Sequence, residues 1–224
     1  MYELQLILDC KQIRNINIMT TSNDTLQQTL DKLKSSVEER LKPKFANAGA
    51  SFPPEKISLI IFKLEQTVEL WALKEKAWKK ITEYPMTAYS GMLGPKLQED
   101  DGQIPEGVYQ MQNLNPQSKF YLSIRINYPN EFDLARAKED GRTHSGSDIY
   151  VHGKDQTVGC IPVGDIAIEE IFYLAGAFGK GEVIISPCKF HDAIPEIQIK
   201  IKMHWYQRLM QTIRGAILKY DQEV

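Results

Sequence analysis

The chain of 224 residues is 42% hydrophobic and 25% charged, with a formal net charge of −2 at pH 7. This composition is typical of a globular protein with a sizeable core, and the balanced charge argues against a general binder of nucleic acid or membrane surfaces. The four His and three Cys residues lack the spacings of a zinc site. No apolar run has the length of a membrane span. Asp9, Lys11 and Arg14 interrupt the apolar N-terminal patch, so no secretory signal is visible.

Apolar residues recur at steps of three and four between residues 22 and 48, which predicts a helix there. Pro43 indicates a kink or an end of this helix, and Gly49 indicates a break after it. Residues 1–21 show no clear period and are expected to form a loose arm. Two further helices are predicted over residues 165–176, with Asp165 as capping residue, and 203–218.

The remaining apolar runs are short and rich in β-branched residues, which predicts strands. A loop rich in Gly, Pro and acidic residues is expected over residues 91–107, and an irregular polar segment over residues 128–146. These patterns predict a fold that is mainly β with peripheral helices. The predicted strands cover residues 57–64, 67–73, 78–82, 86–90, 108–112, 119–127, 147–152 and 182–186.

Reactive side chains gather in the segment from residue 149 to residue 165. Cys160 is a candidate nucleophile, since His152 is close enough in sequence to take the thiol proton. Gly159 leaves room for a substrate carbonyl, and the backbone N–H groups of Gly159 and Cys160 can stabilise an oxyanion. The carbonyl of Gly153 can accept the imidazole N–H and fix its tautomer. The same spacing also fits an inert buried thiol beside a hydrogen-bonded imidazole.

Other polar residues are candidates for the walls of a substrate cleft. No nucleophile elbow surrounds Ser90, so it is interpreted as part of a wall. An isolated His in a polar loop, such as His144, is either a substrate contact at the cleft entrance or simply solvated. Cys10 and Cys188 are interpreted as non-catalytic, and whether they pair stays open. The candidate cleft residues are Tyr89, Ser90, Gly91, His144 and Ser147.

The segments Val151-His152-Gly153 and Val158-Gly159-Cys160, followed by Asp165, resemble the catalytic motif of the L,D-transpeptidase catalytic domain (YkuD-type) family. The likeness is greatest to its YafK-like murein transpeptidase branch, and it continues in order over residues 50–190. The wider family has Ser-His before Gly-Cys, where this chain has Thr157-Val158. This departure and the short loop between His and Cys suit the YafK-like branch.

The resemblance implies a YkuD-like β-sandwich or barrel catalytic domain over residues 50–202. The N-terminal arm and helix (1–49) and a C-terminal helix (203–224) would be additions to it. It also implies a cysteine-dependent L,D-transpeptidase that acts on peptidoglycan stem peptides through a thioester, without a metal or organic cofactor. The expected location is the cell envelope, the periplasm or outside the cell.

Several alternatives stay open at this stage. One alternative to acyl transfer is hydrolysis, by an L,D-carboxypeptidase or by an amidase or endopeptidase that cuts a peptidoglycan–protein link. A secreted toxin directed at the envelope is one form of the hydrolase. A non-enzymatic wall-binding module on the same fold is the alternative of another class, and a cytoplasmic thiol enzyme is a third. The oligomeric state, the export route and the identities of donor and acceptor are not predicted.

Overall fold

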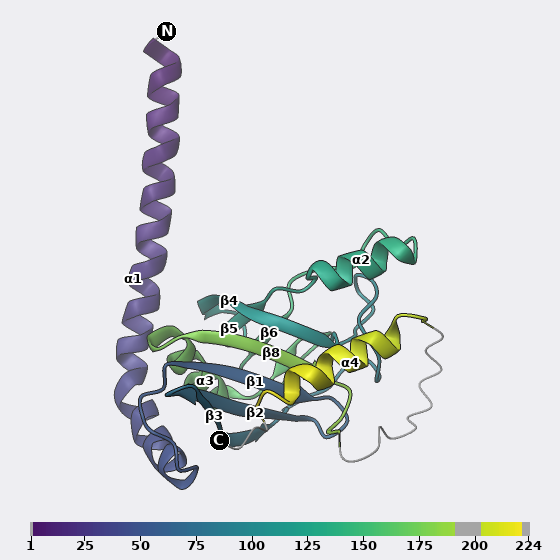
Figure 1. The fold of residues 1–224 in the computed structure, drawn as a ribbon. Coiled ribbons are helices and arrows are strands. Elements are labelled where there is room, and N and C mark those ends of the chain that lie inside the picture. The colour runs from purple at the N-terminus through teal and green to yellow at the C-terminus, as the bar shows by residue number, and fades with distance from the viewer. Residues whose placement is uncertain (1, 191–202, 221–224) are drawn as a thin grey trace.

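The computed structural model describes residues 2–190 and 203–220, with side chains from residue 25 onward. Within these residues, eight strands form one curled mixed sheet in the order β3-β2-β1-β8-β4-β5-β6-β7, with four helices around it (Figure 1). The strands are β1 (Lys56–Phe62), β2 (Thr67–Lys74), β3 (Ala77–Pro85), β4 (Gly107–Ser118), β5 (Tyr121–Ile126), β6 (Tyr150–His152), β7 (Ile161–Pro162) and β8 (Lys180–Ser186). The helices are α1 (Tyr2–Asn47), α2 (Glu131–Glu139), α3 (Asp165–Ala177) and α4 (Tyr206–Ile217). The predicted fold class, mainly β with peripheral helices, is confirmed.

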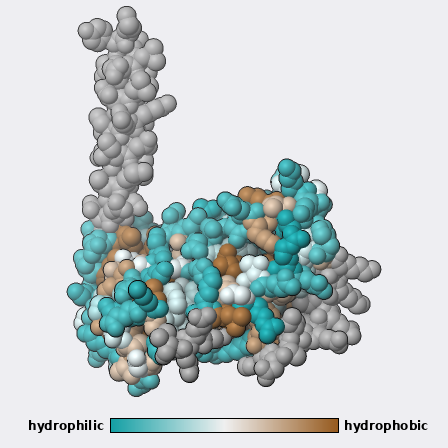
Figure 2. Space-filling view, viewed as in Figure 1, coloured by the Kyte–Doolittle hydropathy of each residue, from teal (hydrophilic) through white to brown (hydrophobic). Residues whose placement is uncertain are grey.

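Each face of the sheet carries a buried core, and different helices pack on the two faces. The buried apolar residues of α1 and α3 form one core with Leu59, Val183 and other inward residues of the sheet. On the opposite face, α4 packs on Ile60 and Ile184. The surface that remains is mostly hydrophilic in the view of Figure 2, with hydrophobic side chains gathered in small patches. Within the described residues, no helix has both the length and the apolar character needed to cross a bilayer.

Helix α1 corrects the prediction for residues 1–21 and agrees with the helix predicted over residues 22–48. It begins at Tyr2, so the expectation of a loose arm over residues 1–21 is wrong. That segment contains neither Gly nor Pro and is rich in good helix formers, which favour a helix even without an apolar stripe. The helix also continues past Pro43 to Asn47. Its second half follows the predicted periodicity, because Leu33, Val37 and Leu41 are all buried against the sheet.

The elements between the strands differ from prediction at three points. Residues 86–90 are not a strand: Met86 donates one backbone hydrogen bond to Gln66 in a turn and Thr87 one to Pro162 at the end of β7, and no ladder forms. The segment predicted to be irregular contains α2, which begins with a capping box formed by Asn130 and Asp133. The residue in the N-cap position of α3 is Gly164 and not Asp165.

A buried ion pair holds the long loop between β3 and β4. The ammonium group of Lys63 donates to the carbonyl oxygens of Gly94 (2.7 Å) and Ile104 (2.8 Å) and lies 3.1 Å from the Glu106 carboxylate. Both charged side chains are completely buried. Glu106 also accepts from the hydroxyl of Tyr206 on α4 at 2.9 Å. The loop that follows residue 90 is therefore fastened both to β1 and to the C-terminal helix.

Candidate active site

His152 and Cys160 lie at the ends of two adjacent strands. His152 is the last residue of β6, and Cys160 directly precedes β7. These strands are parallel, with Val151 opposite Ile161, so the loop between them must turn back over the edge of the sheet. This local pairing brings the two side chains, eight residues apart in sequence, into one pocket of about 190 Å³.

The imidazole of His152 is held in one orientation. Its Nδ1 lies 2.6 Å from the carbonyl oxygen of Gly153, and since a carbonyl can only accept, Nδ1 carries the proton. The other ring nitrogen, Nε2, is then the basic one. The ring of Phe120 stacks at a centroid distance of 4.6 Å, and only 1% of His152 is exposed. Burial lowers the pKa of His152 below its usual value, so the imidazole is neutral at pH 7.

The thiol of Cys160 is less buried than the imidazole and contacts the backbone of the segment before β6. Its Sγ lies 3.7 Å from the carbonyl oxygen of Asp148. Burial raises the pKa of Cys160, although a hydrogen bond from the Tyr150 backbone opposes this effect. A thiol and a neutral imidazole therefore form the resting pair, in which the imidazole can act as a general base.

The walls of this pocket come from the β4–β5 hairpin. Asn115 on β4 lies opposite Ser123 on β5, and Ser123 lies opposite His152 on β6, so the three share one face of the sheet. None of the hairpin residues could be identified as a site residue from the sequence, because their approach to His152 depends on strand register. The pocket is lined by Asn115, Ser118, Lys119, Phe120, Ser123, Tyr150, His152 and Cys160.

The loop that carries Cys160 leans on the segment after β3. The backbone N–H of Gly159 donates to Ser90 Oγ at 2.7 Å. Gly159 has a φ of +99°, and a Cβ there would lie 3.1 Å from the carbonyl oxygen of Gln103, so a side chain would be both strained and crowded. The predicted oxyanion donor at Gly159 is thus engaged by Ser90 in this conformation. Ser90 therefore supports the Cys160 loop, and it is not among the residues that line the pocket.

Gly153 is also enclosed. A Cβ at this position would lie 2.6 Å from the Asp165 carboxylate and 2.9 Å from the carbonyl oxygen of Phe120. The Gly153 N–H donates to Leu122 O at 3.1 Å, which fixes the peptide whose carbonyl holds the His152 ring. Only glycine fits here, and this explains the residue that follows His152 in the motif.

The other candidate cleft residues are more scattered. Tyr89 packs against the core, and its buried hydroxyl is without a hydrogen-bond partner among the described residues. Gly91 abuts the Gln103 side chain. His144 is exposed on a neighbouring loop, where its ring contacts the Thr143 hydroxyl at 2.8 Å. Ser147 is exposed and donates to its neighbour Asp148. Neither His144 nor Ser147 lines the pocket of Cys160.

The raised pKa of Cys160 predicts that its thiol reacts slowly with alkylating reagents at neutral pH. Because the pKa of Cys160 is raised above 9.0, its thiolate fraction and its rate of alkylation should climb through pH 9 without a plateau near neutrality. Peptide-resolved mass spectrometry after brief iodoacetamide treatment at pH 6–10 measures this rate. Buried Cys188, whose pKa is raised to about 11, is the internal control. If the alkylation rate of Cys160 already reached a plateau below pH 7, the resting pair would not be a thiol and a neutral imidazole.

The Ser90–Gly159 hydrogen bond predicts a defect in turnover. A Ser90→Ala variant should lose about five- to tenfold in kcat, the worth of one hydrogen bond that holds the Cys160 loop. Ser147→Ala is the matched control, because that hydroxyl contacts only its exposed neighbour. A rise in kcat for Ser90→Ala would show instead that the freed Gly159 N–H serves the oxyanion.

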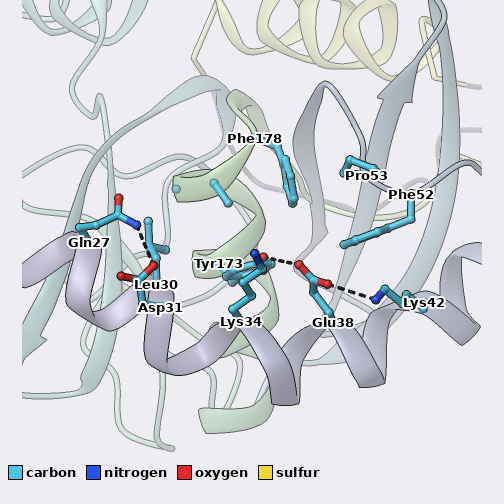
Figure 3. A pocket seen from close by; sticks show the side chains of 12 residues that line it. Gln27, Leu30, Asp31, Lys34, Glu38, Lys42, Phe52, Pro53, Tyr173 and Phe178 are labelled. Atoms are coloured by element: carbon cyan, nitrogen blue, oxygen red, sulfur yellow. Dashed lines mark hydrogen bonds and ion pairs between the residues drawn. The ribbon is translucent and has the colours of Figure 1, made fainter.

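A larger cavity, of about 580 Å³, lies away from this pair, between α1 and the end of α3 (Figure 3). Its floor includes Tyr173, whose hydroxyl donates to Glu38 at 2.6 Å. Phe52 and Phe178 form its aromatic side, with ring centroids 5.8 Å apart. Lysine and acidic side chains alternate on its helical side, so the cavity has no single charge. The described residues that line it include no Cys, Ser or His, unlike those of the smaller pocket.

Comparison with known proteins finds curated relatives in sequence and solved structures of similar fold. No protein-family model matches the chain. It is 35% identical over 140 residues to the Escherichia coli K12 protein named "Putative L,D-transpeptidase YafK", a match that covers 59% of this chain and 54% of YafK. The counterpart from strain O157:H7 matches equally. The chain therefore spans about half the length of the curated relatives it matches.

Among solved structures, a point mutant of the helical cell shape determining protein Pgp2 from Campylobacter jejuni has a similar fold. The TM-score is 0.50 at 19% identity, over 75% of this chain and 56% of that one. At this identity the likeness concerns the fold alone. With the sequence match to YafK, it confirms the predicted resemblance of this chain to the L,D-transpeptidase catalytic domains of the YkuD type.

Proposed function

We propose that this protein is a cysteine-dependent L,D-transpeptidase that acts on peptidoglycan stem peptides. The observation that carries the proposal is the shared pocket of Cys160 and His152, with His152 Nδ1 bound to the Gly153 carbonyl and Nε2 left basic. The sequence match to YafK supports the reaction class. The catalytic part would be residues 50–202, and the substrate implies a location in the cell envelope.

The reaction would run by acyl transfer in two halves. Nε2 of His152 takes the thiol proton as Cys160 Sγ attacks the carbonyl carbon on the L-centre side of an L,D-peptide bond. Backbone N–H groups of the Cys160 loop stabilise the oxyanion, and that of Gly159 can do so only if it leaves Ser90. The imidazolium then protonates the departing amine, and a thioester remains on Cys160.

An acceptor completes the cycle. An amine that enters the pocket loses its proton to His152 and attacks the thioester, which forms a new peptide bond and returns the thiol. Water in the same position would give hydrolysis with the same residues. The pocket of about 190 Å³ has a mostly apolar surface, and the residues that line it include Asn115, Ser118 and Ser123, whose side chains can hydrogen-bond to either acceptor. The products therefore decide between transfer and hydrolysis.

The proposal is tested by incubating the purified protein with a disaccharide-tetrapeptide from bacterial wall and analysing the products by mass spectrometry. Exchange of the terminal D-alanine, or a dimer linked through diaminopimelate, is the expected result. Cys160→Ala should be inert, and Cys188→Ala should retain activity because Cys188 is buried away from the pocket. A shortened stem without exchange would make the protein a hydrolase. If wild type and Cys160→Ala are equally inactive on this substrate and on lipoprotein-linked wall, the protein is not an enzyme of this class, and the remaining alternative is a wall-binding module.

A further inference from the structure

The outer face of β4 carries a row of exposed amide side chains. Gln110, Gln112, Asn113 and Asn115 are all exposed. The register with β5 shifts just after Met111, so that two consecutive amides face outward instead of one. Within the part of the chain that the structure describes, the amides of Gln110, Gln112 and Asn113 have no side-chain hydrogen-bond partner. These four residues are called here the amide track. The first three offer unused neutral donors and acceptors, whereas Asn115 Oδ1 already accepts from the Gln117 N–H at 2.9 Å.

One end of the amide track enters the active-site pocket. Asn115 lines that pocket and lies on the same face as Ser123 and His152, as the pairing of β4, β5 and β6 requires. The face is the one opposite the main core, because Leu114 packs inward with Ile124. A molecule that follows the track is therefore led to the thiol and the imidazole.

The other end of the amide track enters a second cavity of about 300 Å³. Gln110 lies opposite Glu182 on β8, and both line this cavity beside α4. Lys180 donates to the carbonyl oxygen of Gln112 at 2.6 Å, so its ammonium group stands beside the track. Three lysines and one glutamate line the cavity, and this excess of positive charge favours an acidic ligand group. Lys219 already lies 3.9 Å from the Glu182 carboxylate, and Lys56 lies over the Trp78 ring. The charged residues of the cavity are Lys56, Lys180, Lys219 and Glu182.

The two ends are separated by a distance that a small molecule does not span. Gln110 and Asn115 are five residues apart on one strand, which corresponds to about 16 Å of extended backbone. The ligand must therefore be extended. It must also carry many uncharged hydrogen-bonding groups for the amides, and an acidic group for the lysines.

We infer that the amide track and its lysine-lined cavity bind a segment of wall polymer and lead it into the Cys160 pocket. The matching chemistry is that of a glycan strand with hydroxyl and acetamido groups, which bears carboxylates on its stem peptides. This identification of the polymer rests on the proposed function. The track then makes the enzyme prefer stems attached to a polymer over free ones, since only a polymer occupies both cavities at once.

Binding to isolated wall, followed by co-sedimentation, tests the track without any need for turnover. All variants are made in the Cys160→Ala protein, so that the wall is not modified. The triple variant Gln110→Ala/Gln112→Ala/Lys180→Gln should bind about tenfold more weakly, from the loss of three hydrogen-bonding groups. The matched control is Gln207→Ala/Gln211→Ala/Lys32→Gln, which changes three exposed residues on α4 and α1. It should bind like its parent.

The outcomes separate the track from the reaction. Equal binding by the triple variant and its parent overturns the track, and so does a parent that fails to bind wall at all. With Cys160 restored, the triple variant should retain kcat/KM on the soluble disaccharide-tetrapeptide and lose activity on intact wall. If wild type is inert on every substrate while wall binding still depends on the triple substitution, the proposed reaction fails and the track stands.

Discussion

A His152→Gln variant is expected to turn over about 10³-fold more slowly than wild type, within the range that loss of a general base produces. The size follows from the resting state of the pair. Burial raises the pKa of Cys160 and lowers that of His152, so almost no thiolate exists at pH 7 unless the imidazole removes the proton during attack. Glutamine can occupy similar volume but cannot accept the proton. Initial rates on the disaccharide-tetrapeptide at pH 7 measure the loss.

The pH dependence separates a lost base from a distorted site. In wild type, the rate should fall only as pH drops through the lowered pKa of His152, below 6.5, where the imidazole becomes protonated. In His152→Gln, this acid limb should vanish, and the rate should rise with pH above 9 as the thiol ionises unaided. His144→Gln, the same substitution at an exposed His, is the control. Retention of more than about a tenth of the activity in His152→Gln would refute the role of base.

A Lys63→Met variant is expected to lose about 3–5 kcal/mol of unfolding free energy, the usual cost of removing one partner from a buried ion pair. Lys63 and Glu106 are both completely buried, so the substitution leaves the Glu106 carboxylate without its cation. The carbonyl oxygens of Gly94 and Ile104 lose their donor at the same time. Urea denaturation followed by circular dichroism measures the change in unfolding free energy.

Two further variants test this explanation. Lys80→Met removes a lysine that is 39% exposed and paired with Glu69 and Glu83, and it should cost less than about 1 kcal/mol. The double variant Lys63→Met/Glu106→Gln removes both charges and should recover part of the lost stability, since a neutral amide can still accept from the Gly94 N–H. If the double variant is as unstable as Lys63→Met, the unpaired Glu106 carboxylate is not the cause of the lost unfolding free energy.

Every strand except β7, helices α3 and α4 and the second half of α1 could be predicted, because each has a pattern that is complete within its own segment. Helix α2 has no such pattern, since Ala137 is its one buried residue in this structure and no apolar stripe marks it. Its capping box at Asn130 was a local signal that could have identified it. Strand β7 consists of Ile161 and Pro162, too short for any period, and forms only because β6 lies beside it.

The candidate site also has a part that could be predicted from the sequence and a part that could not. His152, Gly153, Gly159 and Cys160 lie in one stretch of sequence, so their proximity could be inferred from a short loop alone. The hairpin that covers them could not, because Phe120 approaches His152 through the register of β5 against β6. The hydrogen bond between Gly159 and Ser90 joins residues that are 69 positions apart in the sequence, so it too depends on the arrangement of the sheet. Local chemistry was predictable, and the surroundings that tune it were set by tertiary contacts.

The stacking of Phe120 on His152 gives this site its own spectroscopic reporter. An aromatic ring 4.6 Å from the imidazole shifts the His152 ring protons upfield in a magnetic resonance spectrum, which separates them from those of the exposed histidines. Phe120 belongs to the rim of the pocket and is 39% exposed, so a bound molecule would displace or reorient it. The position of one resonance would then report occupancy of the pocket directly, including by molecules that never react.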